Sequence, residues 1–144
     1  MYQHILAATD GSDLATAAVS HAAGIARAFN AQLTIVTVLQ GPVFDGMAEV
    51  GAMPQSVFDE VRRANVDRCS AILEKAADAA GPGSQTKMVE SLNAYEGILD
   101  TAKKLGADLI VMGSHSRNPL SRLILGSQAL KVVTLSQVPV LIVR

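Results

Sequence analysis

The sequence predicts an α/β fold in which a parallel sheet lies between layers of helices. Short apolar runs alternate along the 144 residues with longer segments whose apolar residues recur at helical spacing. The short runs are apolar throughout rather than at alternate positions, which is typical of strands covered on both faces. A chain of this length can bury a sizeable core, and we expect one domain over residues 1–144.

The first part of the chain predicts a strand, a helix and a second strand. Residues 4–8 are a short apolar run, and Ser12 can cap the helix that follows. Apolar residues then recur at helical spacing over residues 14–29, with His21 on the apolar face. Residues 33–39 are rich in β-branched residues and are predicted to form the second strand.

A long loop and a long helix are predicted next. Residues 40–54 contain three glycines and two prolines, and this loop is either a flap over a ligand or a plain connector. The helix after it ends at residues 81–83, which read Gly-Pro-Gly. Its one broad apolar face is predicted to consist of Val57, Val61, Ala64, Cys69, Ile72, Leu73, Ala76 and Ala80.

The last part of the chain predicts three strands and two helices. Residues 85–90 are a weak, polar strand candidate. Asn93 and Glu96 resemble a capping box at the start of a helix that Gly106 ends. The remaining elements are a buried strand over residues 109–112, a helix over residues 126–136 and a final strand over residues 138–143.

Composition excludes several classes of function. The chain has a net charge of −1, three Phe, two Tyr and no Trp, which argues against a nucleic-acid-binding protein. The charge is uneven: residues 109–144 carry four basic residues and no carboxylate, whereas residues 1–108 carry eight basic and thirteen acidic residues. Cys69 is the single cysteine and is predicted to be buried. No apolar run is long enough to span a membrane and no secretory pattern is present, so a cytoplasmic protein is expected.

The segment from Gly113 to Ser127 is the best candidate for a site. Ligands of open α/β sheets bind beyond the carboxyl ends of the strands. Gly113 ends a strand, where a missing side chain lets a ligand approach the backbone. Gly126 and Ser127 open a helix whose free N–H groups favour an anion, and Arg117 could add a charge-assisted contact. Neither a Walker loop nor a G-x-G-x-x-G motif is present, so spacing alone leaves a phosphate site and an ordinary loop both open.

The chain resembles the universal stress proteins. Their ATP-binding members carry the motif G-x2-G-x9-G-[S/T], and Gly113, Ser116, Gly126 and Ser127 stand at this spacing. The opening HILAATDGS and the segment from GADLIVMGSHSR to VPVLIVR are also similar, and the resemblance covers essentially the whole chain. It implies a Rossmann-like open five-stranded parallel sheet in the order 3-2-1-4-5, with helices on both faces.

The resemblance also implies that the chain binds ATP, with Mg²⁺ as a candidate companion ion. The residues that it places around the nucleotide are Ala8, Thr9, Asp10, Val38, Met112, Gly113, His115, Ser116, Gly126, Ser127 and Gln128. The first three border the adenine end, and the backbone of Val38 contacts the adenine edge. Met112 and Gly113 lie near the ribose, and the last five surround the phosphates.

Two residues of this set have alternative interpretations. Ser116 replaces the second glycine of the motif, where it either costs about 1 kcal/mol if φ is positive or donates a hydroxyl hydrogen bond to a phosphate. Asp10 could contact a ribose or a phosphate-bound Mg²⁺, or it could brace its own turn. His4 and His21 are predicted to be structural, with no metal-site spacing.

The sequence shows no catalytic constellation. We therefore expect a universal stress protein that acts as an ATP-binding module in the stress response. The alternatives are a dimeric scaffold that needs no nucleotide, because family members without nucleotide binding exist, and a weak ATPase or nucleotide transferase. A homodimer is expected through the last strand, which the resemblance places at a sheet edge and whose apolar residues are Val138, Val140, Leu141, Ile142 and Val143.

Overall fold

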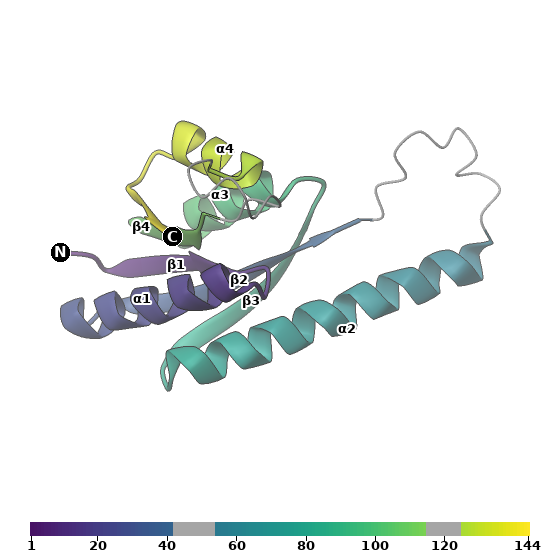
Figure 1. The fold of residues 1–144 in the computed structure, drawn as a ribbon, viewed down its shortest axis with the longest axis horizontal. Helices are drawn as coiled ribbons and strands as arrows, with labels where there is room; N and C mark the ends of the chain where they lie inside the picture. The colour runs from purple at the N-terminus through teal and green to yellow at the C-terminus, as the bar shows by residue number, and fades with distance from the viewer. Residues whose placement is uncertain (42–53, 115–124) are drawn as a thin grey trace.

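The computed structural model describes residues 1–41, 54–114 and 125–144. In this part of the chain the strands form a five-stranded parallel sheet in the order β3-β2-β1-β4-β5, which confirms the predicted fold and strand order (Figure 1). The strands are β1 (His4–Ala8), β2 (Gln32–Gln40), β3 (Ser84–Ser91), β4 (Leu109–Gly113) and β5 (Val140–Val143). The helices are α1 (Asp13–Phe29), α2 (Gln55–Ala80), α3 (Ala94–Leu105) and α4 (Ser127–Leu135).

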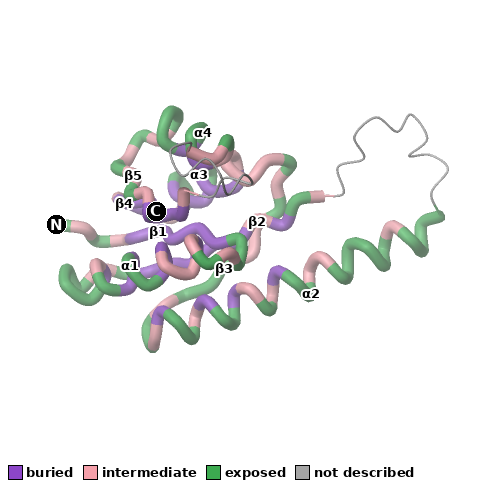
Figure 2. Tube along the Cα trace, in the orientation of Figure 1, coloured by how far each residue is buried: buried purple, intermediate pink, exposed green. Residues whose placement is uncertain are grey.

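The helices cover both faces of the sheet and divide the core into two clusters. On one face, side chains of β1 and β4 such as Ile5 and Val111 pack against α1 and α2. On the other face, Leu6 and Ile110 pack against α3 and α4. Every residue of β4 is buried, as expected of a strand between two neighbours and two helix layers (Figure 2). β3 is polar because it is an edge strand, and several of its residues are exposed.

Local capping explains where the helices begin and end. The Ser12 hydroxyl accepts a hydrogen bond from the Ala15 backbone N–H (3.3 Å), which confirms the predicted cap of α1. Gly106 ends α3 with a left-handed backbone, at φ 63°. The predicted capping box at α3 was wrong. The Asn93 side chain makes no cap hydrogen bond and instead donates to the Glu96 carboxylate (3.1 Å).

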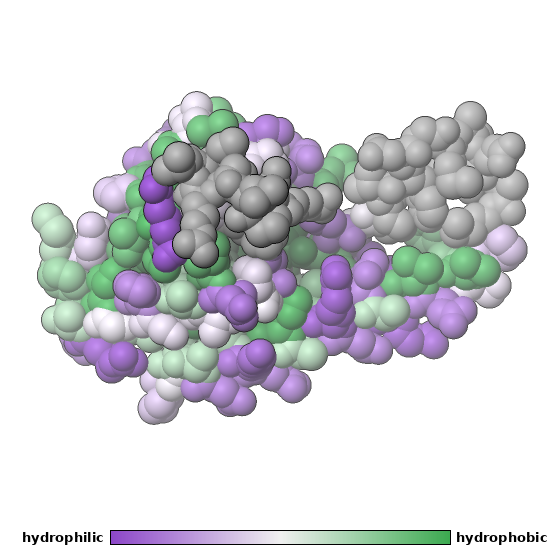
Figure 3. All heavy atoms as spheres, in the orientation of Figure 1, coloured by the Kyte–Doolittle hydropathy of each residue, from purple (hydrophilic) through white to green (hydrophobic). Residues whose placement is uncertain are grey.

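The predicted apolar face of α2 was wrong in its first half. Cys69 and Leu73 are buried, as expected, but Val57 and Val61 are 39% and 38% exposed. The reason is visible in Figure 1: the first turns of α2 extend beyond the sheet, and Figure 3 shows hydrophobic atoms at this end of the helix.

An ion pair links α2 to the edge strand β3. It joins Arg62 on α2 to Glu90 on β3, with N–O distances of 2.5 and 3.1 Å. The Arg62 guanidinium lowers the pKa of the Glu90 carboxyl, first by hydrogen bonding and then by its charge.

The two histidines in the described part of the chain both make intramolecular contacts. The His4 ring lies 2.8 Å from the Thr34 hydroxyl on the neighbouring strand. His21 is exposed rather than on the apolar face of α1, which corrects the prediction, and its ring nitrogen Nδ1 lies 2.9 Å from the Ala17 carbonyl oxygen one turn earlier.

Candidate functional site

The loop after β1 is held by hydrogen bonds within itself and to β2. The Thr9 backbone N–H donates to the Val36 carbonyl (2.9 Å), and the Thr9 hydroxyl accepts from the Gly11 N–H (3.1 Å). Asp10 accepts from the Ser12 N–H through Oδ1 (2.9 Å), so it braces its own turn, as one interpretation of the sequence expected. The carboxylate is exposed, and its Oδ2 takes no hydrogen bond from any described residue. Asp10 can therefore brace the turn and still contact a ligand.

β2 continues beyond the end of β1 and leaves backbone groups unpaired on that side. The pairing of β1 with β2 ends at Ala8 and Val36, whereas β2 stays paired with β3 as far as Gln40 (Figure 1). The Val36 carbonyl points to β1, because it accepts from Thr9. Backbone groups of alternate strand residues point to the same side, so the N–H and C=O of Val38 also face the space beyond β1. Among the described residues, none pairs with Val38 on that side.

Gly113 at the end of β4 lies against the first turn of α1. A Cβ atom at this position would lie 2.9 Å from the Leu14 carbonyl carbon and 3.0 Å from the Ala15 backbone nitrogen. The missing side chain therefore makes room for the first turn of α1. Met112 is buried in the cluster beneath α3 and α4, so only its backbone could contribute to a site at this edge.

Gly113→Ala is expected to destabilise the fold by about 1–3 kcal/mol, because α1 must move away from β4 to admit the methyl group. The free energy of unfolding in urea measures this change. Gly24→Ala on α1 is the control, since a Cβ there meets no atom within 4 Å. We expect the control to stabilise the protein by about 0.5–1 kcal/mol through helix propensity. Equal stability of Gly113→Ala and wild type would contradict this assignment.

The N-terminus of α4 offers backbone donors at the carboxyl edge of the sheet. Gly126 is the N-cap, with φ −57° and ψ 151°, and its carbonyl accepts from the Leu130 N–H (2.9 Å). The N–H groups of Ser127 and the two residues after it precede this first helical bond and have no acceptor within the helix. Ser127 is exposed and Gln128 is half-buried. These free donors could bind an anion.

Gln128 also has a structural role that the sequence did not indicate. Its side-chain oxygen accepts from the Tyr95 N–H at the start of α3 (3.0 Å), and the Lys131 ammonium lies 4.7 Å from the centroid of the Tyr95 ring. These contacts bring the N-termini of α3 and α4 together. The side-chain oxygen of Gln128 is thus already engaged, whereas its backbone N–H remains a candidate donor.

The predicted site residues that the structure describes belong to elements on both sides of β1, where the direction of strand order changes. β1 pairs with β2 on one side and β4 on the other, so the sheet is wound in opposite directions from this point. Three of the predicted site residues, His115, Ser116 and Arg117, lie outside the described residues, as do residues 42–53 of the predicted loop. The other predicted residues belong to the loop after β1, to β2, to the end of β4 and to the start of α4.

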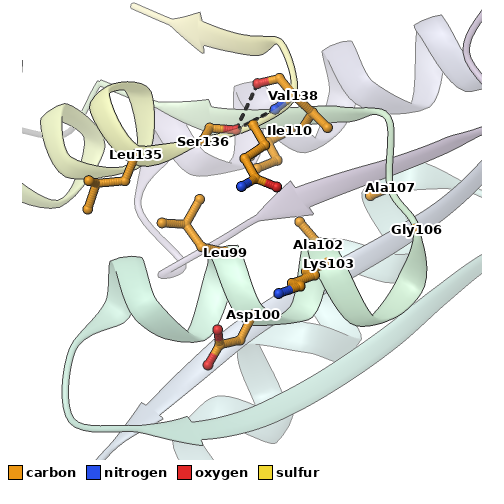
Figure 4. Close-up of a pocket in the computed structure, with 11 residues that line it drawn as sticks. Leu99, Asp100, Ala102, Lys103, Gly106, Ala107, Ile110, Leu135, Ser136 and Val138 are labelled. Carbon is orange, nitrogen blue, oxygen red and sulfur yellow. Dashed lines mark hydrogen bonds between the residues drawn. The ribbon is translucent and has the colours of Figure 1, made fainter.

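Two cavities lie near the surface of the described residues. One, of about 280 Å³, lies between the loop after β1 and α2, and its lining includes Thr9, Gly11, Arg68 and Lys75. The other, of about 240 Å³, lies at the opposite, amino edge of the sheet, between α3 and the connection from α4 to β5 (Figure 4). The Ser136 hydroxyl in this second cavity already bonds Val138 within the same loop. Position and chemistry therefore favour the carboxyl edge over the second cavity.

Comparison with known proteins identifies the family of the chain. Residues 1–144 match the Universal stress protein family. The chain belongs to that family. It is 36% identical to the universal stress protein YxiE of Bacillus subtilis over the whole of both chains. It is 33% identical to universal stress protein MJ0531 of Methanocaldococcus jannaschii, over 100% of this chain and 83% of that protein.

Solved structures of universal stress proteins share the fold. One, a universal stress protein in complex with cAMP, is 30% identical with a TM-score of 0.72, over 99% of this chain and 97% of that chain. UspA from Lactobacillus plantarum is 28% identical with a TM-score of 0.77, over 99% and 98% of the two chains. Among the described helices of this universal stress protein, none combines the length and hydropathy that a bilayer-spanning segment requires.

Proposed function

We propose that this universal stress protein binds ATP, together with Mg²⁺, at the carboxyl edge of the sheet and acts as a binding module in the stress response. The observation that carries the proposal is the unpaired backbone of Val38 beside the point where strand order changes. A relative with 30% identity was crystallised with cAMP, which supports an adenine nucleotide as the ligand class. We further propose that nucleotide occupancy changes contacts with partner proteins in the cytoplasm.

The base end of the proposed site is formed by Val38 and the loop after β1. Val38 presents one N–H donor and one C=O acceptor to the space beyond β1, and both are free of strand partners among the described residues. Adenine carries an amino donor at N6, where guanine carries a carbonyl acceptor at O6. A backbone carbonyl at this position therefore favours adenine over guanine. Ala8 and Thr9 would form the floor next to the base, and both are buried.

The phosphate end of the proposed site is the start of α4. The free N–H groups and the helix dipole both favour negative charge at Gly126 and Ser127. The proposal also keeps His115, Ser116 and Arg117 as phosphate neighbours. Mg²⁺ is usually held by one or two carboxylates together with the phosphates of the nucleotide. Asp10, whose exposed carboxylate has a free oxygen, is the candidate, because the described residues hold no group of three metal-ligating side chains.

Mass spectrometry of the nucleotide released from purified protein tests the proposal. We expect an adenine nucleotide in the supernatant after the protein is denatured. A nucleotide-free protein that also fails to bind added ATP would favour the dimeric scaffold instead. ATP turnover well above that of a heat-inactivated control would favour the weak ATPase.

Substitution of Ser116 by glycine decides the role of the residue that departs from the family motif. If serine is strained at this position, Ser116→Gly is expected to strengthen ATP binding by about fivefold, because a strain of roughly 1 kcal/mol is relieved. If the hydroxyl donates to a phosphate, the same change weakens binding by a similar factor. Titration calorimetry gives the sign. An unchanged affinity would show that residue 116 does not face the nucleotide.

We also propose that the protein forms a homodimer through β5. This strand is an edge of the sheet, paired only with β4 among the described strands. Leu141 is 37% exposed on β5, and Leu130, Val133 and Leu135 are exposed on α4. An apolar edge with unpaired backbone groups favours pairing with a second copy across a two-fold axis. Val138, Val140, Ile142 and Val143 complete the proposed contact segment.

A further inference from the structure

Gly97 on α3 lies directly against the residue proposed to contact the base. A Cβ atom built on Gly97 would lie 2.9 Å from Cγ2 and 3.0 Å from Cγ1 of Val38, and 3.3 Å from Cβ of Ser91. Gly97 is buried near the start of a helix, where glycine lowers helix stability relative to alanine. A helical glycine with a crowded neighbour indicates that close packing, rather than backbone conformation, requires it.

The Val38 side chain cannot turn away from this contact. Both of its γ carbons face Gly97, so two of the three staggered positions around Cβ point toward the helix. Rotation about χ1 by 120° places the Cβ hydrogen of Val38 in one of these two positions, but a methyl group still occupies the other. Every rotamer of Val38 therefore keeps at least one methyl group against Gly97. Room for a larger residue at position 97 therefore comes from movement of the Val38 backbone or of α3.

Movement of α3 is opposed by contacts on its other sides. The Tyr95 N–H at the start of α3 donates a hydrogen bond to the Gln128 side chain on α4 (3.0 Å). Ile98 and Ala102 are buried in the core between α3 and the sheet. Val38 lies in the part of β2 that continues beyond the end of β1. Among the described strands, this part of β2 is paired with β3 only. The strand is thus the element with more freedom to shift.

From these contacts we infer that Gly97 is a positioning residue that sets the location of the Val38 N–H and C=O groups for the base. The inference rests on the proposed nucleotide site. It assigns to α3 a role in base recognition that does not involve contact with the nucleotide. The phosphate end, at Gly126 and Ser127, does not depend on this contact.

Calorimetric titrations of the full-length protein with ATP and with inorganic tripolyphosphate test the inference. Gly97→Ala is expected to weaken ATP binding by roughly tenfold, because small misplacements of binding groups have large effects. Tripolyphosphate, which lacks a base, should bind as in wild type. Gly97→Ala combined with Val38→Ala should bind ATP more tightly than Gly97→Ala alone, since the two γ carbons that collide are removed. Gly24→Ala, an open position on α1, is the matched glycine control and should bind like wild type.

The outcomes separate the inference from the proposed function. Wild-type protein that binds ATP, with equal affinity in Gly97→Ala, overturns the positioning role and leaves the proposed function intact. Loss of ATP and tripolyphosphate binding to the same extent in Gly97→Ala overturns it too, because the effect would then be general. Wild-type protein that binds no ATP overturns both.

Discussion

Ile142→Pro is expected to convert the protein from a dimer into a folded monomer, whereas Leu141→Pro is expected to destabilise the fold itself. The two residues are adjacent on β5, but their backbone groups point to opposite sides. The Ile110 N–H donates to the Pro139 carbonyl and the Ser114 N–H donates to the Val143 carbonyl. Odd-numbered residues of β5 therefore face β4, and Val140 and Ile142 face outward, toward the proposed partner strand.

The stability cost of Leu141→Pro comes from the sheet. Proline removes the N–H that faces β4 and leaves a buried carbonyl of that strand without its donor, which costs about 1–3 kcal/mol. Light scattering gives the oligomeric state and urea unfolding gives the stability. Ile142→Ala and Leu141→Ala are the controls, because each shortens the same side chain and keeps the backbone N–H. Dimers in all four variants, or a wild-type monomer at high micromolar concentration, would exclude β5 as the interface.

Gly126→Val is expected to remove the preference for ATP over AMP. A branched side chain at the N-cap blocks the approach of the outer phosphates to the free N–H groups of α4. The loss of two charge-assisted hydrogen bonds of about 1.5 kcal/mol each weakens ATP binding about 100-fold. Competition titrations with ATP and AMP measure this change.

The fold should tolerate the substitution, because φ at Gly126 is −57°, a value that valine adopts without strain. Gly24→Val on α1 is the matched control, in which the same change is made where a Cβ meets no atom within 4 Å. Circular dichroism and thermal melting should be similar for the two variants. An unchanged ratio of ATP to AMP affinity in Gly126→Val would show that the start of α4 does not bind phosphate.

Sequence pattern predicted the strands well, because runs such as residues 109–112 are buried on both faces and therefore apolar throughout. Sequence pattern gave a wrong prediction where apolar residues at the same helical spacing lie in different environments. Val57 and Val61 keep the helical spacing of Cys69 and Leu73, but the sheet does not extend beneath them. Periodicity within one helix cannot indicate where its neighbour ends.

The sequence did not indicate the packing role of each glycine near the proposed site. Gly113 stands at the expected strand end, yet its missing side chain accommodates α1, which only the packing of distant elements reveals. Gly97 is not among the predicted site residues, although an isolated glycine inside a helical pattern is a signal of close packing. The hydrogen bond between Gln128 and Tyr95 joins two helices. A local sequence pattern cannot predict it, because the two residues are far apart in the chain.

Calorimetric titration of the nucleotide-free wild-type protein with ATP, AMP and GTP tests the central proposal most directly. Val38 and the start of α4 together predict saturable binding of one ATP per chain, with weaker binding of AMP, which lacks the outer phosphates. They also predict weaker binding of GTP, whose O6 carbonyl cannot donate to the Val38 carbonyl. Absence of ATP binding at millimolar concentration, or equal affinity for all three nucleotides, would contradict the proposed site.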